Sequence, residues 1–222
     1  MTSTVPIVMV SVGDAVAAGL VRSLAQPGGN VTGQSFMGPE MTVKQFDLLA
    51  EAFPRAKRIA VLFAPAIATR TPAGEPVGIR AVGAAAQARG VAVQPVEVHR
   101  PDDFERALAP ARKARHDAML VYAVNFAQQS QIVEFAAKHR LPAIYGFRTA
   151  VDAGGLMSFG PKLAELWRGA NYVDRILEGA KPGDLPVEQP ATFEFVVNLK
   201  TAKTLGVTIP PALLARADDV VQ

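Results

Sequence analysis

Short apolar runs recur along this chain, and each is followed by a helical pattern. Ile59–Phe63, Met119–Tyr122 and Ala143–Phe147 are too short to be core helices and lead into stretches that contain Gly, Pro, Asn or Ser. Strands that are apolar on both faces need helices above and below them, so the pattern predicts a parallel α/β sheet. Ligands bind at the carboxyl ends of the strands in such sheets. Those ends carry no obvious catalytic set here, which favours a binding protein over an enzyme.

The first 54 residues contain only two predicted strands, at 6–11 and 30–35, with a small-residue helix at 15–24 between them. A capping-box pattern at Thr42-Val43-Lys44-Gln45 predicts a further helix, which Pro54 ends. Two strands are too few for a sheet of normal size. We therefore expect residues 1–54 to be the remnant of an N-terminal lobe, with residues 156–180 crossing back to it.

Residues 55–155 and 181–222 are expected to form a complete C-terminal α/β lobe. Its strands alternate with helices predicted near 78–89, 102–114 and 127–139. A long helix with apolar positions at helical spacing is predicted over 163–177. Gly and Ser residues at 34–38 and 154–160 are candidates for hinges between the lobes.

Composition narrows the function classes. The chain has 222 residues, a net charge of +3 and basic clusters only near 55–58 and 112–115. No aromatic residues are interleaved with them, so nucleic-acid binding is not expected. The absence of cysteine excludes disulfides and thiolate chemistry. No window approaches the roughly 20 apolar residues of a membrane-spanning helix, and no basic-then-apolar leader opens the sequence.

The three histidines do not indicate an active site. His99, His116 and His139 fall at predicted strand or helix ends, and no two have metal-ligand spacing. The sequence contains no nucleophile elbow, no P-loop and no dinucleotide-binding glycine pattern. We expect no enzymatic activity, no metal and no cofactor. A small-molecule enzyme on an α/β fold is the least favoured alternative.

Candidate ligand-binding residues follow the predicted strand ends. They are Ser11, Asp14, Tyr122, Asn125, Tyr145 and Phe147. A carboxylate suits an ammonium group, and aromatic walls with one amide suit a small amphipathic or aromatic solute. The alternatives are that Asp14 only caps the helix at 15–24 and that the aromatic rings are packing residues.

Several stretches carry a resemblance to a known family. They keep their order along the chain: Pro6-Ile7-Val8, Ser11-Val12-Gly13-Asp14, Pro27-Gly28-Gly29-Asn30-Val31-Thr32-Gly33, Lys57-Arg58-Ile59-Ala60-Val61-Leu62, Leu141-Pro142-Ala143-Ile144-Tyr145, Ala153-Gly154-Gly155-Leu156-Met157-Ser158-Phe159-Gly160, Leu185-Pro186-Val187-Glu188-Gln189-Pro190 and Asn198-Leu199-Lys200-Thr201-Ala202-Lys203. Together they resemble the ABC transporter substrate-binding protein family, whose relatives include aromatic-amino-acid binding proteins.

The resemblance implies an α/β fold of the type I periplasmic-binding-protein kind, with parallel sheets flanked by helices. It implies capture of a small molecule, with an amino acid as the candidate, between two lobes that close about hinges. The partners would be an ABC permease and its ATPase, and the location periplasmic. Ser158 lies in one matching motif and joins the candidate residues. Ala64 joins them too, because the family often has Asn-Pro where this chain has Ala64-Pro65.

The resemblance also implies a chain that is truncated at its start. Family members have a signal peptide and two further strand–helix units before the position of Pro6. One complete lobe plus part of a second is therefore expected, and a homodimer through the incomplete lobe is one way to cover its apolar faces. The alternative function is the ligand-sensing domain of a LacI-type regulator, which shares this fold.

Overall fold

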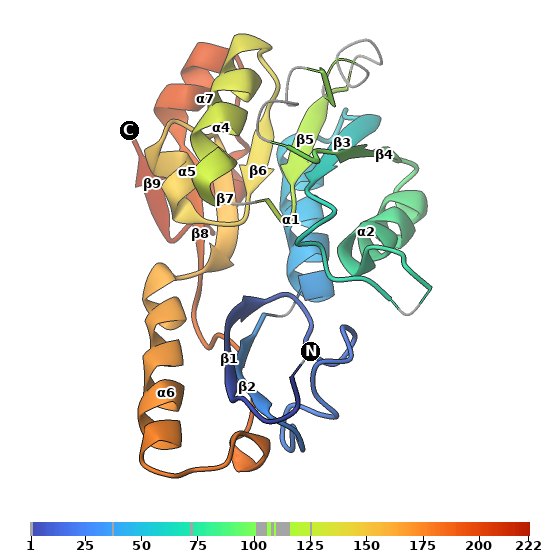
Figure 1. The fold of residues 1–222 in the computed structure, drawn as a ribbon. Helices are drawn as coiled ribbons and strands as arrows, with labels where there is room; N and C mark the ends of the chain where they lie inside the picture. Colours follow the sequence, from blue (N-terminus) through green and yellow to red (C-terminus); the bar gives the residue numbers. More distant parts are fainter. Residues whose placement is uncertain are drawn as a thin grey trace.

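The computed structural model describes residues 2–36, 38–71, 73–100, 106–107, 109, 116–124 and 126–222, with only the backbone described for Ser11, Phe126 and Leu166. The helix predicted at 102–114 falls almost wholly outside these residues. The chain forms two α/β lobes, each built around its own sheet (Figure 1). We call them the large lobe, with seven strands, and the small lobe, with two.

The large lobe is a mostly parallel sheet in the order β4-β3-β5-β6-β7-β8-β9. Among the described strands, only β7 and β8 are antiparallel neighbours, with Phe159 opposite Phe195. The strands are β3 (Arg58–Phe63), β4 (Ala92–Glu97), β5 (Ala118–Val121), β6 (Ala143–Tyr145), β7 (Met157–Pro161), β8 (Phe193–Asn198) and β9 (Asp219–Val221). The prediction of an α/β sheet flanked by helices is confirmed.

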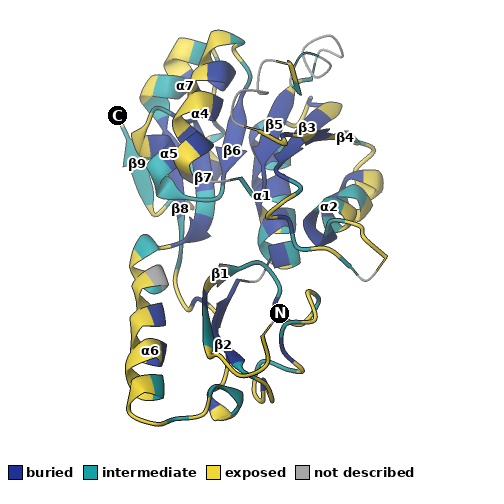
Figure 2. Cartoon of the chain, viewed as in Figure 1, coloured by how far each residue is buried: buried dark blue, intermediate teal, exposed yellow. Residues whose placement is uncertain are grey.

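Helices cover both faces of the large sheet, and its central strands β5 and β6 are buried at every position (Figure 2). Ile59 and Val61 of β3 pack with α1 and α2, whereas Ala60 and Leu62 pack with α4. The larger helices are α1 (Gly38–Ala52), α2 (Val77–Ala88), α4 (Gln129–Lys138) and α7 (Leu199–Leu205), and the shorter elements are α5 (Arg148–Asp152), α8 (Pro211–Leu214) and the 3-10 turn η2 (Phe126–Gln128). Helix α1 begins before the predicted capping box, and the Thr42 hydroxyl donates to the Gly38 carbonyl inside the helix (2.6 Å).

The small lobe contains β1 (Ile7–Val12) and β2 (Val31–Ser35), which are parallel. Its other elements are η3 (Leu163–Arg168), α6 (Gly169–Leu177) and η4 (Pro182–Asp184), so the helix predicted over 163–177 begins as a 3-10 turn. The helix predicted at 15–24 is wrong, because residues 15–19 form turns. Ala15 and Val21 are the residues of this stretch that are buried in the small core, and a separation of six does not place two residues on one helix face.

Three segments connect the lobes, and they differ in part from the predicted boundaries. Helix α1 packs on the large sheet, so the change of lobe lies between Ser35 and Gly38 and not at residue 54. The chain returns to the small lobe after Pro161, because β7 pairs with β8 as far as Pro161. The third segment, residues 189–191, follows Glu188, which is hydrogen-bonded to β2, and leads to β8.

Candidate functional site

A cavity of about 360 Å³ lies at the carboxyl ends of the strands, between the two lobes. Gly13 and Phe36 reach it from the small lobe, after β1 and β2. From the large lobe it is lined by Met41, Gln45, Ile67, Thr69, Val121, Tyr122, Ala123, Val124, Gln129, Tyr145, Gly146 and Phe147, with Gly38 at the junction. This is the position that the strand-end rule predicts for a ligand.

Aromatic side chains meet across the boundary of the lobes. The rings of Phe36 and Phe147 are tilted by 57°, with centroids 6.2 Å apart. Aromatic pairs of this geometry are attractive. The contact joins the end of β2 to the residue that caps α5. A planar apolar solute placed here would touch both lobes at once.

Tyr122 forms a rigid part of the cavity wall. Its ring is buried and lies against Gly78 in the first turn of α2, where an added Cβ would be 2.6 Å from the Tyr122 Cζ. Burial raises the pKa of the Tyr122 phenol, the Gly78 N–H that donates to its oxygen lowers it, and the Asp14 carboxylate raises it. The side chain is therefore a neutral, fixed phenol at neutral pH.

Tyr145 also lines the cavity, but its ring belongs to the core. It is 1% exposed and packs with apolar residues of α4 and α5. Burial raises the pKa of its phenol well above the ordinary value. The packing alternative left open from the sequence therefore describes the Tyr145 side chain.

Two buried amides contribute polar atoms to the cavity. Gln45 donates from Nε2 to the Phe159 carbonyl (2.7 Å), and Gln129 accepts at Oε1 from the Thr149 hydroxyl (2.7 Å). Within the part of the chain that the structure describes, Gln45 Oε1 and Gln129 Nε2 make no hydrogen bond. One acceptor and one donor are thus available to a ligand.

The electrostatics of the cavity come from backbone and not from lining charges. Among the described lining residues there is no Asp, Glu, Lys, Arg or His. The amino ends of α1 and α4 reach the cavity at Gly38 and Gln129. Helix amino ends carry partial positive charge, so they favour the anionic group of a ligand.

Other sequence-predicted residues lie outside the described lining. Asp14 Oδ1 accepts from the N–H groups of Val16 and Ala17 (3.1 and 2.9 Å), so it caps a turn where a helix was predicted. Ala64 is buried and its N–H donates to the Ala123 carbonyl (3.1 Å). Ser158 is fully buried in β7, and its Oγ has no partner among the described atoms.

The remaining candidates, Asn125 and the Ser11 side chain, lie outside the described residues. Sequence reasoning missed Phe36, Gln45 and Gln129. Gln45 could have been found from the sequence, because it lies one turn from Leu49 on the buried face of α1. A polar side chain on a buried face needs a hydrogen-bond partner.

Two α/β lobes with a cavity between their strand ends define a type I periplasmic-binding-protein-like fold. The chain belongs to the family of ABC transporter substrate binding proteins, whose pattern matches residues 1–221. Over 208 residues it is 26% identical to a tyrosine-binding protein of Clostridioides difficile, a match that covers 92% of this chain and 58% of that protein. The chain therefore spans little more than half the length of this relative.

Two solved structures are similar over 99% of the chain. One is an ABC domain from Streptococcus pneumoniae in complex with L-Trp, with a TM-score of 0.82, 27% identity and 73% of that chain covered. The other is a conserved domain protein from Vibrio cholerae, with a TM-score of 0.84, 29% identity and 72% of that chain covered. Both confirm the predicted fold class.

Proposed function

We propose that this chain is the solute-binding part of an ABC importer and that its solute is an aromatic amino acid. The cavity between the lobes, walled by Phe36, Tyr122 and Phe147, is the observation that carries the proposal. Its volume of about 360 Å³ falls in the range of roughly 300–1,000 Å³ for small-molecule sites. The relatives that bind tyrosine and tryptophan support the same solute class.

Each part of an aromatic amino acid has a counterpart at this site. The ring would lie between the aromatic walls, and the carboxylate would face the helix amino ends at Gly38 and Gln129. The Asp14 carboxylate, which is close enough to influence Tyr122, would attract the ammonium group. Gln45 and Gln129 would bond a polar atom on the ring.

Transport would follow from closure of the lobes on the solute, after which a permease with its ATPase receives it. Ligand contacts made only in the closed arrangement would shift the population toward it. Members of the family are extracellular or periplasmic, and we propose the same location here. No helix among the described residues has both the length and the apolar character to cross a bilayer. The family match favours this function over a ligand-sensing regulator or an enzyme.

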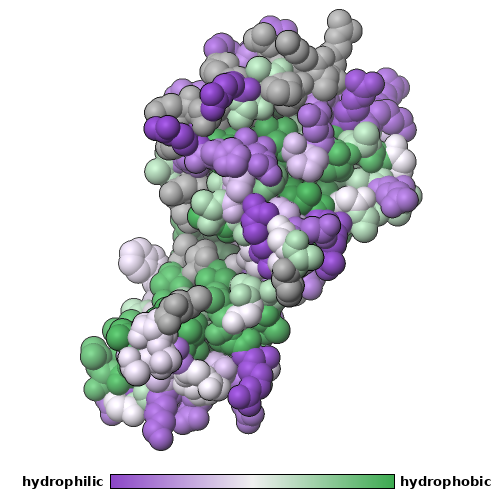
Figure 3. All heavy atoms as spheres, turned by 45° about the vertical axis from the view of Figure 1, so that its right-hand side comes forward, coloured by the Kyte–Doolittle hydropathy of each residue, from purple (hydrophilic) through white to green (hydrophobic). Residues whose placement is uncertain are grey.

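A homodimer remains a prediction of the sequence. Val10, Val173 and Leu177 of the small lobe are exposed. Figure 3 shows that hydrophobic residues cover part of the surface of this lobe. Such a face favours association. Sedimentation of the chain at several concentrations tests this point separately from ligand binding.

Calorimetric titration tests the proposed solute class. L-tryptophan, L-tyrosine and L-phenylalanine are expected to bind, whereas L-leucine and L-glutamate bind weakly or not at all. A ligand at 100 times its Kd should also raise the free energy of unfolding by about 2.7 kcal/mol. The proposal fails if the folded chain binds none of the aromatic amino acids or prefers L-glutamate.

A further inference from the structure

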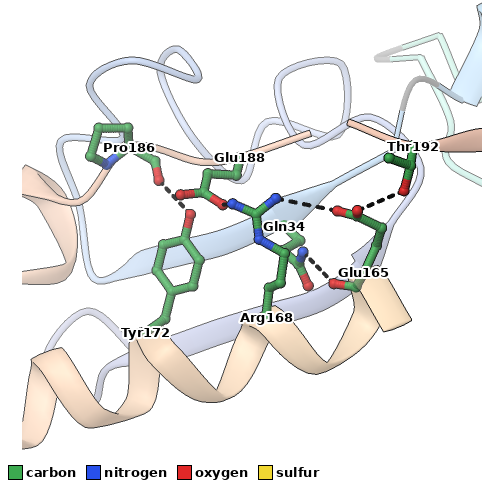
Figure 4. A network of polar contacts seen from close by, with 7 residues as sticks. All are labelled: Gln34, Glu165, Arg168, Tyr172, Pro186, Glu188 and Thr192. Atoms are coloured by element: carbon green, nitrogen blue, oxygen red, sulfur yellow. Dashed lines mark hydrogen bonds and ion pairs between the residues drawn. The ribbon is translucent and has the colours of Figure 1, made fainter. Parts of the chain in front are cut away.

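A polar network joins residues next to all three connections between the lobes (Figure 4). Gln34 is the penultimate residue of β2, Glu165 and Arg168 lie in η3 after the second connection, and Glu188 and Thr192 flank the third. The network lies away from the cavity, since none of these residues is among its described lining. It therefore has no direct contact through which to recognise a solute.

Glu165 is the centre of this network. Its Oε1 accepts from the Thr192 hydroxyl (2.7 Å), its Oε2 pairs with Arg168 Nη1 (3.2 Å) and its carbonyl accepts from Gln34 Nε2 (2.7 Å). Arg168 Nη2 also pairs with Glu188 Oε2 (2.7 Å). The hydrogen bond from Thr192 is the main cause that lowers the pKa of the Glu165 carboxyl, so this group is ionised at neutral pH.

The two ends of the third connection belong to different lobes. Glu188 is fixed to the small lobe, because its N–H donates to Gly33 (3.0 Å) and its carbonyl accepts from Ser35 (2.9 Å). Thr192 is fixed to the large lobe, because its carbonyl accepts from Lys162 (3.2 Å) next to the β7–β8 ladder. Any rotation between the lobes must therefore bend the chain between Glu188 and Thr192.

The Glu165 side chain spans this bend. It comes from η3, which packs against β1 of the small lobe, and it reaches Thr192 at the edge of the large lobe. The same lobe arrangement brings Phe36 against Phe147 and Gly13 against Thr69 at the cavity. A rotation between the lobes that bends the chain between Glu188 and Thr192 would therefore change the distance between the Glu165 carboxylate and the Thr192 hydroxyl.

We propose that Glu165 and Thr192 form a latch that holds the lobes in the ligand-binding arrangement and that Arg168 positions the carboxylate for it. The expected effect on solute affinity rests on the proposed function. The effect on the separation of the lobes does not depend on it. A protein whose binding-competent arrangement is less populated binds with a proportionally higher apparent Kd. Loss of the hydrogen bond from Thr192 should weaken solute binding by roughly two- to tenfold, the effect of one typical hydrogen bond.

Thr192→Val tests the latch because it removes the hydroxyl and keeps the shape of the side chain. The conservative variant Thr192→Ser keeps a hydroxyl and should restore the latch. Thr204→Val is the matched control, because its hydroxyl bonds the Lys200 carbonyl in α7 (3.0 Å), away from the connections. Circular dichroism checks that all three variants fold.

The separation of the lobes is the direct readout. The chain has no cysteine, so Glu178→Cys on the small lobe and Lys203→Cys on the large lobe give two unique sites for spin labels. We expect Thr192→Val to broaden and shift the ligand-free distance distribution, with Thr192→Ser and Thr204→Val unchanged. L-tryptophan should return the Thr192→Val distribution to that of the parent.

The outcomes separate the latch from the proposed function. A shifted distribution in Thr192→Val without binding of any aromatic amino acid supports the latch and refutes the solute class. An unchanged distribution in a folded Thr192→Val protein overturns the latch, even if solute affinity falls. If Thr192→Val does not fold, Glu165→Leu takes its place, because it removes both carboxylate oxygens, and an unchanged distribution there overturns the latch equally.

Discussion

Helix α2 contains two glycines for which the same substitution should have opposite effects. An added Cβ at Gly83 meets no atom within 4 Å, whereas at Gly78 it would be 2.6 Å from Tyr122 Cζ and 2.7 Å from Cε2. Gly78→Ala therefore tests whether helix α2 and the Tyr122 ring are packed as tightly as the structure indicates. Gly83→Ala is its control on the same helix.

Two energies compete at Gly78. Alanine in a helix is more favourable than glycine by about 0.5–1 kcal/mol, because glycine loses more backbone entropy on folding. Overpacking a tight site costs about 1–3 kcal/mol. The ring cannot swing away freely, since Tyr122 is only 8% exposed. We expect Gly78→Ala to lower the free energy of unfolding by about 0.5–2 kcal/mol, the difference between these terms.

Urea denaturation followed by circular dichroism measures both variants. Gly83→Ala should shift the midpoint upward, by the equivalent of about 0.5–1 kcal/mol, and Gly78→Ala should shift it downward. Gly78→Ala should also weaken solute binding, because displacement of the Tyr122 ring changes the wall of the cavity. If both variants become more stable by the same amount, the contact between α2 and the cavity wall is not as described.

Two further predictions concern the aromatic residues. Phe147→Ala should weaken binding of L-tryptophan by about twofold to tenfold, the worth of one aromatic contact. Phe193→Ala is the control, because it removes a ring that stacks on Phe159 outside the described cavity lining. This variant should leave the affinity measured by calorimetry unchanged. If both variants lose the same affinity for L-tryptophan, Phe147 is not part of the site. All three tyrosines have a pKa raised by burial. The native state binds these phenol protons more tightly than the unfolded chain does. The free energy of unfolding should therefore keep this contribution up to the ordinary tyrosine pKa of 10.0 and fall as the pH rises beyond it. Phenolate absorbance that increases well below pH 10.0, with the protein still folded, would contradict this.

The large sheet could be predicted because its signal is local. Every position from Ile59 to Phe63 is apolar, and a strand that must be buried on both faces has few architectures open to it. The boundary at residue 54 was less accurate because α1 follows β2 in sequence but packs on the other lobe. Amphipathic periodicity identifies the buried face of a helix and not the sheet that covers it.

The site was predictable only where it follows strand ends. Tyr122, Tyr145 and Phe147 follow strand ends, and the structure places all three around one cavity, but their contact with a solute stays a prediction. Phe36 was missed because it lies in a connection between lobes, and its role depends on a ring more than 100 residues away in sequence. The latch around Glu165 depends likewise on the pairing of β7 with β8, which brings Thr192 beside η3.

The cavity depends on the arrangement of the lobes more than on either lobe alone. The large lobe supplies most of the described lining, whereas Gly13 and Phe36 alone come from the strand ends of the small lobe. A ligand can shift the equilibrium between open and closed lobes only by its differential affinity for the two states. Few lining contacts with the small lobe make this difference in affinity small. Interactions outside the cavity would add to the preference for the closed arrangement. Glu165 and Thr192 lie where they can do so, since they join the lobes beside the chain segments that must bend.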